Sequence, residues 1–304
     1  MTPHRPRISV VGSLNMDLVV STGRMPTVGE TIQGSAIHYI PGGKGANQAV
    51  GCARLGAEVS MIGAVGDDAF GQEIIRRMKE KGVEMNHVTI QKGVPTGTAT
   101  ILHLPDDNCI VVVPGANGSV TTEMVEEARD IIETADVLLV QLEIPLQAVE
   151  RALSIAKKAG VLTVLNPAPA QLLYDSILRL ADYMTPNETE FAILSGDRSI
   201  EHMDLTTVLS RWQTAHHHKL IVTRGSEGVS YLSEGQLKHV PAPKVKPVDT
   251  VGAGDCFNAA FGFAMACGYT IDKALKFAVK AASISVTRFG AQDSMPTIEE
   301  VGES

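Results

Sequence analysis

Residues 137–165 read VLLVQLEIPLQAVERALSIAKKAGVLTVL. Two short apolar runs, 137–140 and 161–165, flank a segment over 146–159 in which leucine, valine and alanine recur at helical spacing. An apolar run of four or five residues fits a strand that is buried on both faces, and the amphipathic segment fits a helix that crosses between two parallel strands. The stretch therefore predicts a β-α-β unit.

The same alternation continues in both directions along the chain. Further apolar or β-branched runs lie at residues 8–11, 59–65, 183–184 and 220–223, with helical patterns between them. We therefore expect an α/β fold with a mostly parallel central sheet and helices on both faces. Sheets of this kind bind their ligands at the carboxyl ends of the strands.

Two strand-like stretches, approximately residues 16–41 and 88–114, interrupt the alternation because no helical pattern separates their strands. Residues 98–104 and 109–113, joined by turn residues at 105–108, predict a β-hairpin. We expect both stretches to form a small β-sheet that lies over the main sheet as a lid. The lid would be discontinuous in sequence, within a single α/β domain that spans residues 1–304.

Composition limits the class of protein. Of 304 residues, 44% are hydrophobic and 20% are charged, which is ordinary for a globular protein. The 26 Lys and Arg against 34 Asp and Glu give a net charge of -8, which repels phosphate backbones, so no nucleic-acid partner is expected. The four cysteines show no paired spacing, and no apolar run approaches the roughly 20 residues of a membrane helix. We expect a cytoplasmic protein with no membrane partner and no export signal.

The strongest signal for chemistry is DTVGAGD at residues 249–255, which precedes a helical pattern over 256–266. Gly252 and Gly254 allow a ligand to approach the backbone closely, and the unpaired N–H groups at a helix start attract a phosphate oxygen. Asp255 fits two roles, since a carboxylate in the first turn also serves as an ordinary helix-stabilising charge. This motif is not a dinucleotide loop, because Phe257 stands where the third glycine belongs, and Gly43-Lys44 is not part of a Walker A loop, because Gly45 stands where Ser or Thr belongs, so phosphate chemistry here needs another architecture.

Two more loops carry polar groups at expected ligand positions. GSLNMD at residues 12–17 follows the first strand, and Asn15 and Asp17 are spaced to hold neighbouring hydroxyl groups. PGGKGANQ at residues 41–48 opens a helical pattern and forms either a tight turn or a polar platform with side-chain donors.

Together these motifs resemble the ribokinase–fructokinase family of carbohydrate kinases. The resemblance runs from about Ile8 to Pro296 in the family's order, and it includes PGAN at 114–117, NPAPA at 166–170 and NETE at 187–190. It implies an enzyme that uses ATP to phosphorylate D-ribose at the 5-hydroxyl, giving D-ribose 5-phosphate. The alternatives are another sugar kinase of the family, acting on deoxyribose, fructose or a nucleoside, and a non-catalytic sugar-sensing protein.

The resemblance also implies individual roles. Asp255 would take the hydroxyl proton, with Gly252, Ala253 and Gly254 forming an anion hole for the transferring phosphoryl group. The implied ribose contacts are Asn15, Asp17, Gly43, Lys44, Asn47, Glu143 and Asp255. The implied nucleotide contacts are Asn187, Thr223, Gly225, Gly228 and Gly254. Without the resemblance, Glu143 also fits a solvated loop acid.

Two cations and a dimer are implied as well. Asn187 and Glu190 match the pair that places Mg²⁺ through water, although they also fit a helix N-cap with its capping box. The implied K⁺ site comprises Asp249, Val251, Ser285, Arg288, Gly290 and Ser294, mostly through backbone carbonyls. Open sheet edges in the lid are expected to be protected by homodimerisation.

Two further sequence features bear on the nucleotide end and on metals. Val279 stands where the family often places a polar residue near the adenine. Three consecutive histidines at 216–218 are predicted to be solvated surface and not a metal site.

Overall fold

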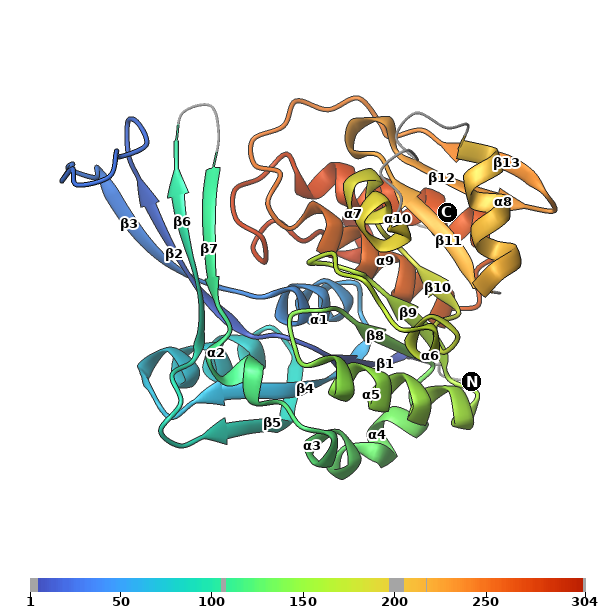
Figure 1. The fold of residues 1–304 in the computed structure, drawn as a ribbon, viewed down its shortest axis with the longest axis horizontal. Coiled ribbons are helices and arrows are strands. Elements are labelled where there is room, and N and C mark those ends of the chain that lie inside the picture. Colours follow the sequence, from blue (N-terminus) through green and yellow to red (C-terminus); the bar gives the residue numbers. More distant parts are fainter. Residues whose placement is uncertain (1–4, 105–107, 197–204, 217, 303–304) are drawn as a thin grey trace.

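The computed structural model describes residues 5–104, 108–196, 205–216 and 218–302. Its main sheet has nine strands in the order β13-β12-β11-β10-β9-β8-β1-β4-β5 (Figure 1). The strands from β11 to β5 pair in parallel, and β12 and β13 add an antiparallel edge. The bounds are β1 Arg7–Val11, β4 Glu58–Gly66, β5 Val83–Gln91, β8 Val137–Val140, β9 Leu162–Leu165, β10 Tyr183–Met184, β11 Lys219–Thr223, β12 Val229–Ser233 and β13 Gln236–Val240.

The predicted β-α-β unit is confirmed. β8 and β9 pair in parallel, with Val137 opposite Leu162 and Val140 opposite Leu165, and the helix α5 (Leu146–Ala159) connects them. The helix ends at Ala159 and is capped by Gly160, whose φ of 77° is a left-handed conformation that glycine adopts without a steric penalty.

The two faces of the sheet bury separate cores because alternate residues of each strand point to opposite sides. In β1, Ile8 and Val10 join one apolar cluster and Val11 joins the other. Helices α1 (Lys44–Arg54), α2 (Ala69–Glu80), α9 (Ala253–Ala266), α10 (Ile271–Ser285) and α11 (Ile298–Val301) contribute to the first cluster. Helices α3 (Thr122–Glu127), α4 (Arg129–Glu133), α5, α6 (Asp175–Leu178), α7 (Glu188–Ser195) and α8 (Leu205–His216) contribute to the second. The expected α/β fold with helices on both faces is confirmed.

A separate four-stranded sheet, called the lid here, projects from the main body (Figure 1). Its order is β3-β2-β6-β7, with β2 Asn15–Ser21, β3 Ala36–Gly42, β6 Gly97–His103 and β7 Asn108–Val113. β6 and β7 form the predicted antiparallel hairpin, whose turn at 105–107 lies outside the described residues. The expected lid boundary near residue 88 was too early, because β5 continues to pair with β4 in the main sheet as far as Gln91.

Among the described residues, no helix is long and apolar enough to cross a membrane.

Candidate active site

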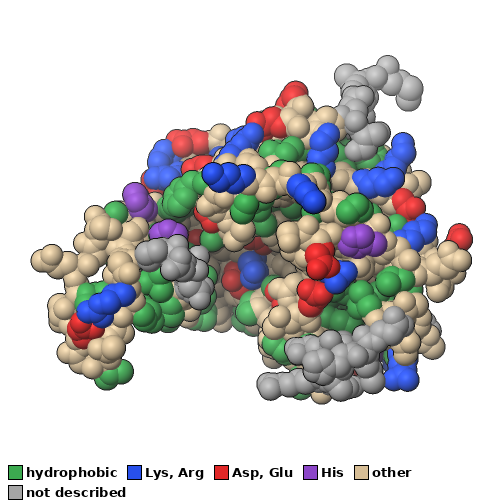
Figure 2. All heavy atoms as spheres, turned by 90° about the horizontal axis from the view of Figure 1, so that it is seen from above, with side chains coloured by type: hydrophobic (Ala, Val, Ile, Leu, Met, Phe, Trp, Pro, Cys, Tyr) green, Lys and Arg blue, Asp and Glu red, His purple; other side chains and the backbone are tan. Residues whose placement is uncertain are grey.

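Motifs that are far apart in sequence meet at the carboxyl ends of the central strands. The Asn47 side-chain amide on α1 donates to Asp255 Oδ2 at 2.9 Å, and the neighbouring Gln48 amide donates to Asp255 Oδ1 at 3.1 Å. Asp255 itself lies in the first turn of α9 and is only 6% exposed. A hollow opens between the lid and the main body, with charged side chains of both signs at its floor (Figure 2).

The start of α9 presents backbone N–H groups beside this carboxylate. Gly252 caps the helix with a φ of 78°, and a Cβ there would lie 2.8 Å from the Ala291 Cβ, so both conformation and space require glycine. The helix supplies no carbonyl for its first N–H groups. Gly254, in contrast, is exposed, and a Cβ placed on it would meet no atom within 4 Å. The N-terminus of α9 is therefore open to an anionic ligand.

The charged groups around Asp255 influence one another's pKa values. Burial raises the pKa of Asp255, while Lys44 and the amides of Asn47 and Gln48 lower it. For Lys44, burial lowers the pKa, but the carboxylates of Asp255, Glu143 and Glu190 together outweigh that effect and the pKa is raised. The Lys44 cation therefore favours the ionised form of Asp255.

Glu143, for which a solvated position was the alternative, connects two loops. Its Oε2 accepts hydrogen bonds from the Ser13 hydroxyl and from the Lys44 backbone N–H, the latter at 3.0 Å. The carboxylate thus holds the loop after β1 against the start of α1. Gly43, with a φ of 90°, packs its α-carbon against the Ser13–Asn15 backbone, where a side chain would collide.

The side chain of Asn15 is held in place by Asn117, a residue to which the sequence analysis assigned no role. Asn117, in PGAN, donates from Nδ2 to Asn15 Oδ1 at 2.7 Å, and it accepts from the Leu14 N–H at 2.9 Å. Both asparagines are buried. This contact fixes the orientation of the Asn15 amide, and its partner lies 102 residues away, beyond the range of local sequence patterns.

The carboxyl group of Asp17, on β2, is also perturbed by burial. Burial, then Glu143 and Asp255, raise the pKa of Asp17 to about 7, and its Oδ1 is buried without a hydrogen-bond partner. A Cβ on Gly42 would come within 2.2 Å of Asp17 Oδ2, so glycine is needed there. The unpartnered Oδ1 can accept a hydrogen bond from a ligand hydroxyl.

Asp17→Asn is expected to stabilise the ligand-free protein above neutral pH. A folded-state pKa of about 7 against 3.8 when unfolded means that folding binds a proton, so wild-type stability falls as the pH rises through this window. The neutral amide lacks this penalty, and the difference should reach about 2 kcal/mol by pH 8 after allowance for partial exposure. Urea unfolding of both proteins at pH 5 and pH 8 measures it. An equal difference at both pH values would contradict the raised pKa.

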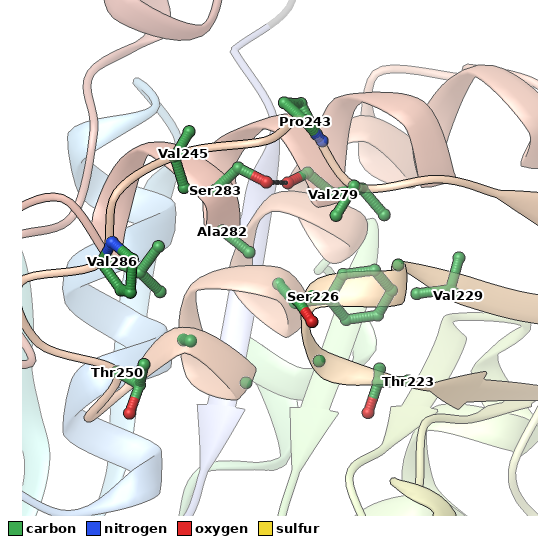
Figure 3. A pocket seen from close by; sticks show the side chains of 17 residues that line it. Thr223, Ser226, Val229, Pro243, Val245, Thr250, Val279, Ala282, Ser283 and Val286 are labelled. Atoms are coloured by element: carbon green, nitrogen blue, oxygen red, sulfur yellow. Dashed lines mark hydrogen bonds between the residues drawn. The ribbon is translucent and has the colours of Figure 1, made fainter.

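A second cavity of about 400 Å³ adjoins the start of α9 (Figure 3). Of the predicted nucleotide residues, Thr223, Gly225, Gly228 and Gly254 line it and Asn187 does not. Its other wall is largely apolar and includes Val229, Pro243, Val245, Val279, Ala282 and Val286. The Ser283 hydroxyl donates to the Val279 carbonyl at 2.8 Å and so turns back into α10 (Figure 3). This wall suits the flat faces of a purine base.

Sequence reasoning missed most of this wall, although α10 carries a signal for it. Val279, Ala282, Ser283 and Val286 are spaced three, four and seven residues apart, which is one helical face.

The chain is similar to known proteins over nearly its full length. A model of the family described as "pfkB family carbohydrate kinase" matches residues 5–298. The chain belongs to the pfkB family of carbohydrate kinases. It is 43% identical over 296 residues to a Bacillus subtilis ribokinase, covering 97% of this chain and 98% of that protein. A deoxyribokinase of Salmonella typhi is 36% identical over 298 residues, covering 97% of each. The structure of an Arabidopsis thaliana ribokinase complexed with ribose and ATP matches with a TM-score of 0.89 at 33% identity, covering 98% of both chains.

In this pfkB kinase, the side chains of Asn187 and Glu190 each accept a hydrogen bond from the other residue's backbone N–H. Asn187 Oδ1 accepts the Glu190 N–H at 2.7 Å, and Glu190 Oε2 accepts the Asn187 N–H at 2.8 Å, which confirms the capping box at the start of α7. Burial raises the pKa of Glu190, and Lys44 partly opposes this. Among the described residues, no three His, Cys, Asp or Glu side chains gather into a metal-binding group.

Of the residues expected at the K⁺ site, Val251 and Gly290 contact the side chain of Asp249, which lies in the loop before α9. Its Oδ1 accepts the Val251 N–H and its Oδ2 accepts the Gly290 N–H, each at 3.0 Å. The hydroxyls of Ser285 and Ser294 donate to backbone carbonyls of their own segments, and Arg288 pairs with Glu300. Ser285 and Ser294 are buried, and Arg288 points its charge toward Glu300, so only its backbone is available to a cation.

The histidine prediction was wrong for His218. His218 is 3% exposed, accepts the Trp212 indole N–H at 2.7 Å and contacts the Leu178 carbonyl at 3.1 Å. Burial, with the neighbouring His216, lowers the pKa of His218 to about 4, so it is a neutral core residue. His216 is half-buried, and His217 lies outside the described residues.

Proposed function

We propose that this pfkB kinase transfers the γ-phosphoryl group of ATP to the 5-hydroxyl of D-ribose. One observation carries the proposal: the buried Asp255 carboxylate lies in the first turn of α9, between the polar residues of α1 and the cavity lined by Thr223 and Gly225. The ribokinases among the relatives support ribose and ATP as the two substrates.

The chemistry follows from this arrangement. Asp255 accepts the proton of the 5-hydroxyl as its oxygen attacks the γ-phosphorus, the bond to the bridging oxygen of ATP breaks, and ADP leaves. The N–H groups at the start of α9 stabilise charge on the transferring group. Closure of the lid over the hollow excludes water, which would otherwise accept the phosphoryl group.

The residues present fit both expected cations. Mg²⁺ prefers oxygen ligands and keeps several waters, so the side-chain oxygens of Asn187 and Glu190 suit it when the phosphates supply the remaining ligands. Bound there, Mg²⁺ would neutralise phosphate charge. K⁺ suits Asp249, whose carboxylate is met by two N–H donors and no cationic side chain among the described residues. Bound K⁺ would offset the charge of that carboxylate next to the α9 loop.

Selectivity for ribose rests on Asn15 and Asp17, which we assign to the 2- and 3-hydroxyls. Asn15 is held by Asn117, and Asp17 has an unpartnered buried oxygen, so loss of one sugar hydroxyl would leave a buried polar group unpaired. Such a loss typically costs about 1–3 kcal/mol. The deoxyribokinase relative makes 2-deoxyribose the sharpest competitor to test.

Release of ADP from ATP and Mg²⁺, measured with ribose, 2-deoxyribose, fructose and adenosine, tests the proposal. We expect the highest kcat/KM on ribose and stimulation when K⁺ replaces a larger organic cation. Preference for another sugar would overturn the assignment of Asn15 and Asp17. The absence of turnover on every substrate would favour the sugar-sensing alternative.

We also propose that two copies pair through their lids. The lid leaves large apolar side chains half exposed on β3 and β7: Ile37, Tyr39, Ile110, Val111, Val112 and Val113. Edge strands with such exposure are normally covered. Ile110→Lys is expected to convert a dimer to a monomer in sedimentation velocity, while Leu237→Lys, at an exposed apolar position on β13, leaves the dimer intact. A wild-type protein that sediments as a monomer would contradict this.

A further inference from the structure

Behind the Asp255 carboxylate lies a chain of buried side-chain amides. Gln48 Nε2 lies 3.1 Å from Asp255 Oδ1 and 3.3 Å from Asn166 Oδ1, and Gln141 Nε2 lies 2.6 Å from Gln48 Oε1. Gln48 is 1% exposed and Gln141 is fully buried. None of these three amides belongs to the contacts expected for ribose, ATP or a cation.

The direction of this chain is fixed by chemistry. An ionised carboxylate only accepts hydrogen bonds, so Gln48 must turn its NH₂ group toward Asp255. Its oxygen then faces Gln141, which must present its own NH₂ group. The Gln141 oxygen is left beside Gly12, where a Cβ would lie only 2.0 Å from it. The absence of a side chain at Gly12 therefore leaves room for the Gln141 side chain.

The chain continues to the loop that holds the anion hole. Asn166 Nδ2 donates to the Thr185 carbonyl at 3.4 Å, and the Thr185 hydroxyl donates to Asn258 Oδ1 at 2.6 Å. Asn258 in turn donates to the Gly254 carbonyl at 2.8 Å. The carboxylate of Asp255 and the backbone of Gly254 are thus tied to the ends of β9 and β10 through one polar network.

We infer that Gln48, oriented by Gln141, is a positioning residue that holds the Asp255 carboxylate toward the sugar and keeps it ready to accept a proton. The inference rests on the proposed role of Asp255 as the base. Asn47 also donates to Asp255 through its NH₂ group. Its Oδ1, however, is buried without a partner and is available to the sugar, so the Asn47 side chain serves both Asp255 and the substrate. Gln48, in contrast, has its oxygen satisfied by Gln141 and its NH₂ group by Asp255 and Asn166, so protein groups alone hold it against Asp255.

The electrostatics agree with this role. Burial is the largest influence on Asp255 and raises its pKa, and Gln48 is one of the groups that lower it. The charged groups that act on the site are Lys44 on α1, Glu143 after β8, Asp17 on β2 and Glu190 on α7. Removal of the Gln48 donor leaves these charges in place and favours the protonated carboxyl group, which cannot act as a base.

Gln48→Met tests the inference, because methionine keeps the length and helix preference of glutamine and removes the three hydrogen bonds with Asp255, Asn166 and Gln141. We expect kcat for ribose phosphorylation at pH 7 to fall about tenfold, with KM for ribose changed less than threefold. The acid limb of the kcat profile should move up by 0.5 to 1 pH unit, roughly as expected for loss of one hydrogen bond to a carboxylate, so that activity partly recovers at pH 9. Gln72→Met, at an exposed position on α2, is the matched control and should leave the profile unchanged.

Gln141→Met supplies the second arm. It should shift the acid limb in the same direction by a smaller amount, and the Gln48→Met/Gln141→Met double variant should show no further shift, because Gln141 acts only through Gln48. Equal pH profiles for wild type and Gln48→Met, or independent additive losses, would overturn the inference. Asp255→Asn distinguishes failure of this inference from failure of the proposed function. If that variant keeps full turnover, Asp255 is not the base, and the proposed function itself is wrong.

Discussion

Asp255→Asn is expected to lower kcat for ribose phosphorylation by about 10²- to 10⁴-fold, the range typical for loss of a general base. The amide keeps the size of the carboxylate, but it cannot take the hydroxyl proton, and it can accept from only one of the two amide donors, Asn47 and Gln48, that hold Asp255. The KM for ribose should change by less than tenfold, because most of the sugar contacts remain. Initial rates of ADP release at saturating ATP and ribose measure both constants.

Asp67→Asn is the matched control, since Asp67 is an exposed carboxylate at the end of β4, outside the site. Its kinetics should equal those of the wild type. If Asp255→Asn and Asp67→Asn were equally active, proton transfer to Asp255 would be excluded as a step in turnover.

Gly254→Val is expected to abolish most turnover without loss of stability. A Cβ at Gly254 would meet no atom within 4 Å in the ligand-free protein, and the residue has no positive φ, so the fold tolerates a side chain. The same space is the open mouth of the α9 N-terminus, where the phosphoryl group must approach the N–H groups. We expect kcat to fall by about 10²-fold or more, as for loss of an oxyanion donor, with a melting temperature within about 3 °C of wild type.

Gly23→Val makes the matched control for this substitution. Gly23 is exposed in the lid, it has no positive φ, and a Cβ placed on it would also meet no atom within 4 Å. Its replacement should therefore affect neither stability nor turnover. Full activity of Gly254→Val would show that the phosphoryl group does not approach α9 at this point.

Periodicity was sufficient to predict the scaffold of the site. The helix over 146–159 was predicted at its observed bounds because its apolar positions recur every three or four residues and glycine follows its last turn. The start of a strand was predicted less accurately. β9 begins at Leu162 and not at residue 161, because the apolar run includes a residue of the preceding turn. The lid boundary was wrong for a related reason, because β5 has the same β-branched composition as the lid strands that follow it.

The sequence motifs identified the residues that carry the chemistry, but they did not identify the residues that hydrogen-bond to them. Asn117 and Gln141 act on residues about a hundred positions away, and no local pattern records such a contact. His218 shows the opposite error: its polar sequence neighbours suggested a solvated position, whereas packing against Trp212 buries it. Long-range hydrogen bonds and burial are properties of the folded chain, so they appear only with the structure.

The position of the transferred phosphate tests the central claim most directly. Ribose and ATP-Mg²⁺ are incubated with the protein, and the product is examined by phosphorus and carbon NMR. We expect one ADP per sugar phosphate and a phosphate on the 5-oxygen, the hydroxyl that we propose lies against Asp255. Phosphate on the anomeric oxygen, or ADP formed without any sugar phosphate, would contradict the proposed site and its chemistry.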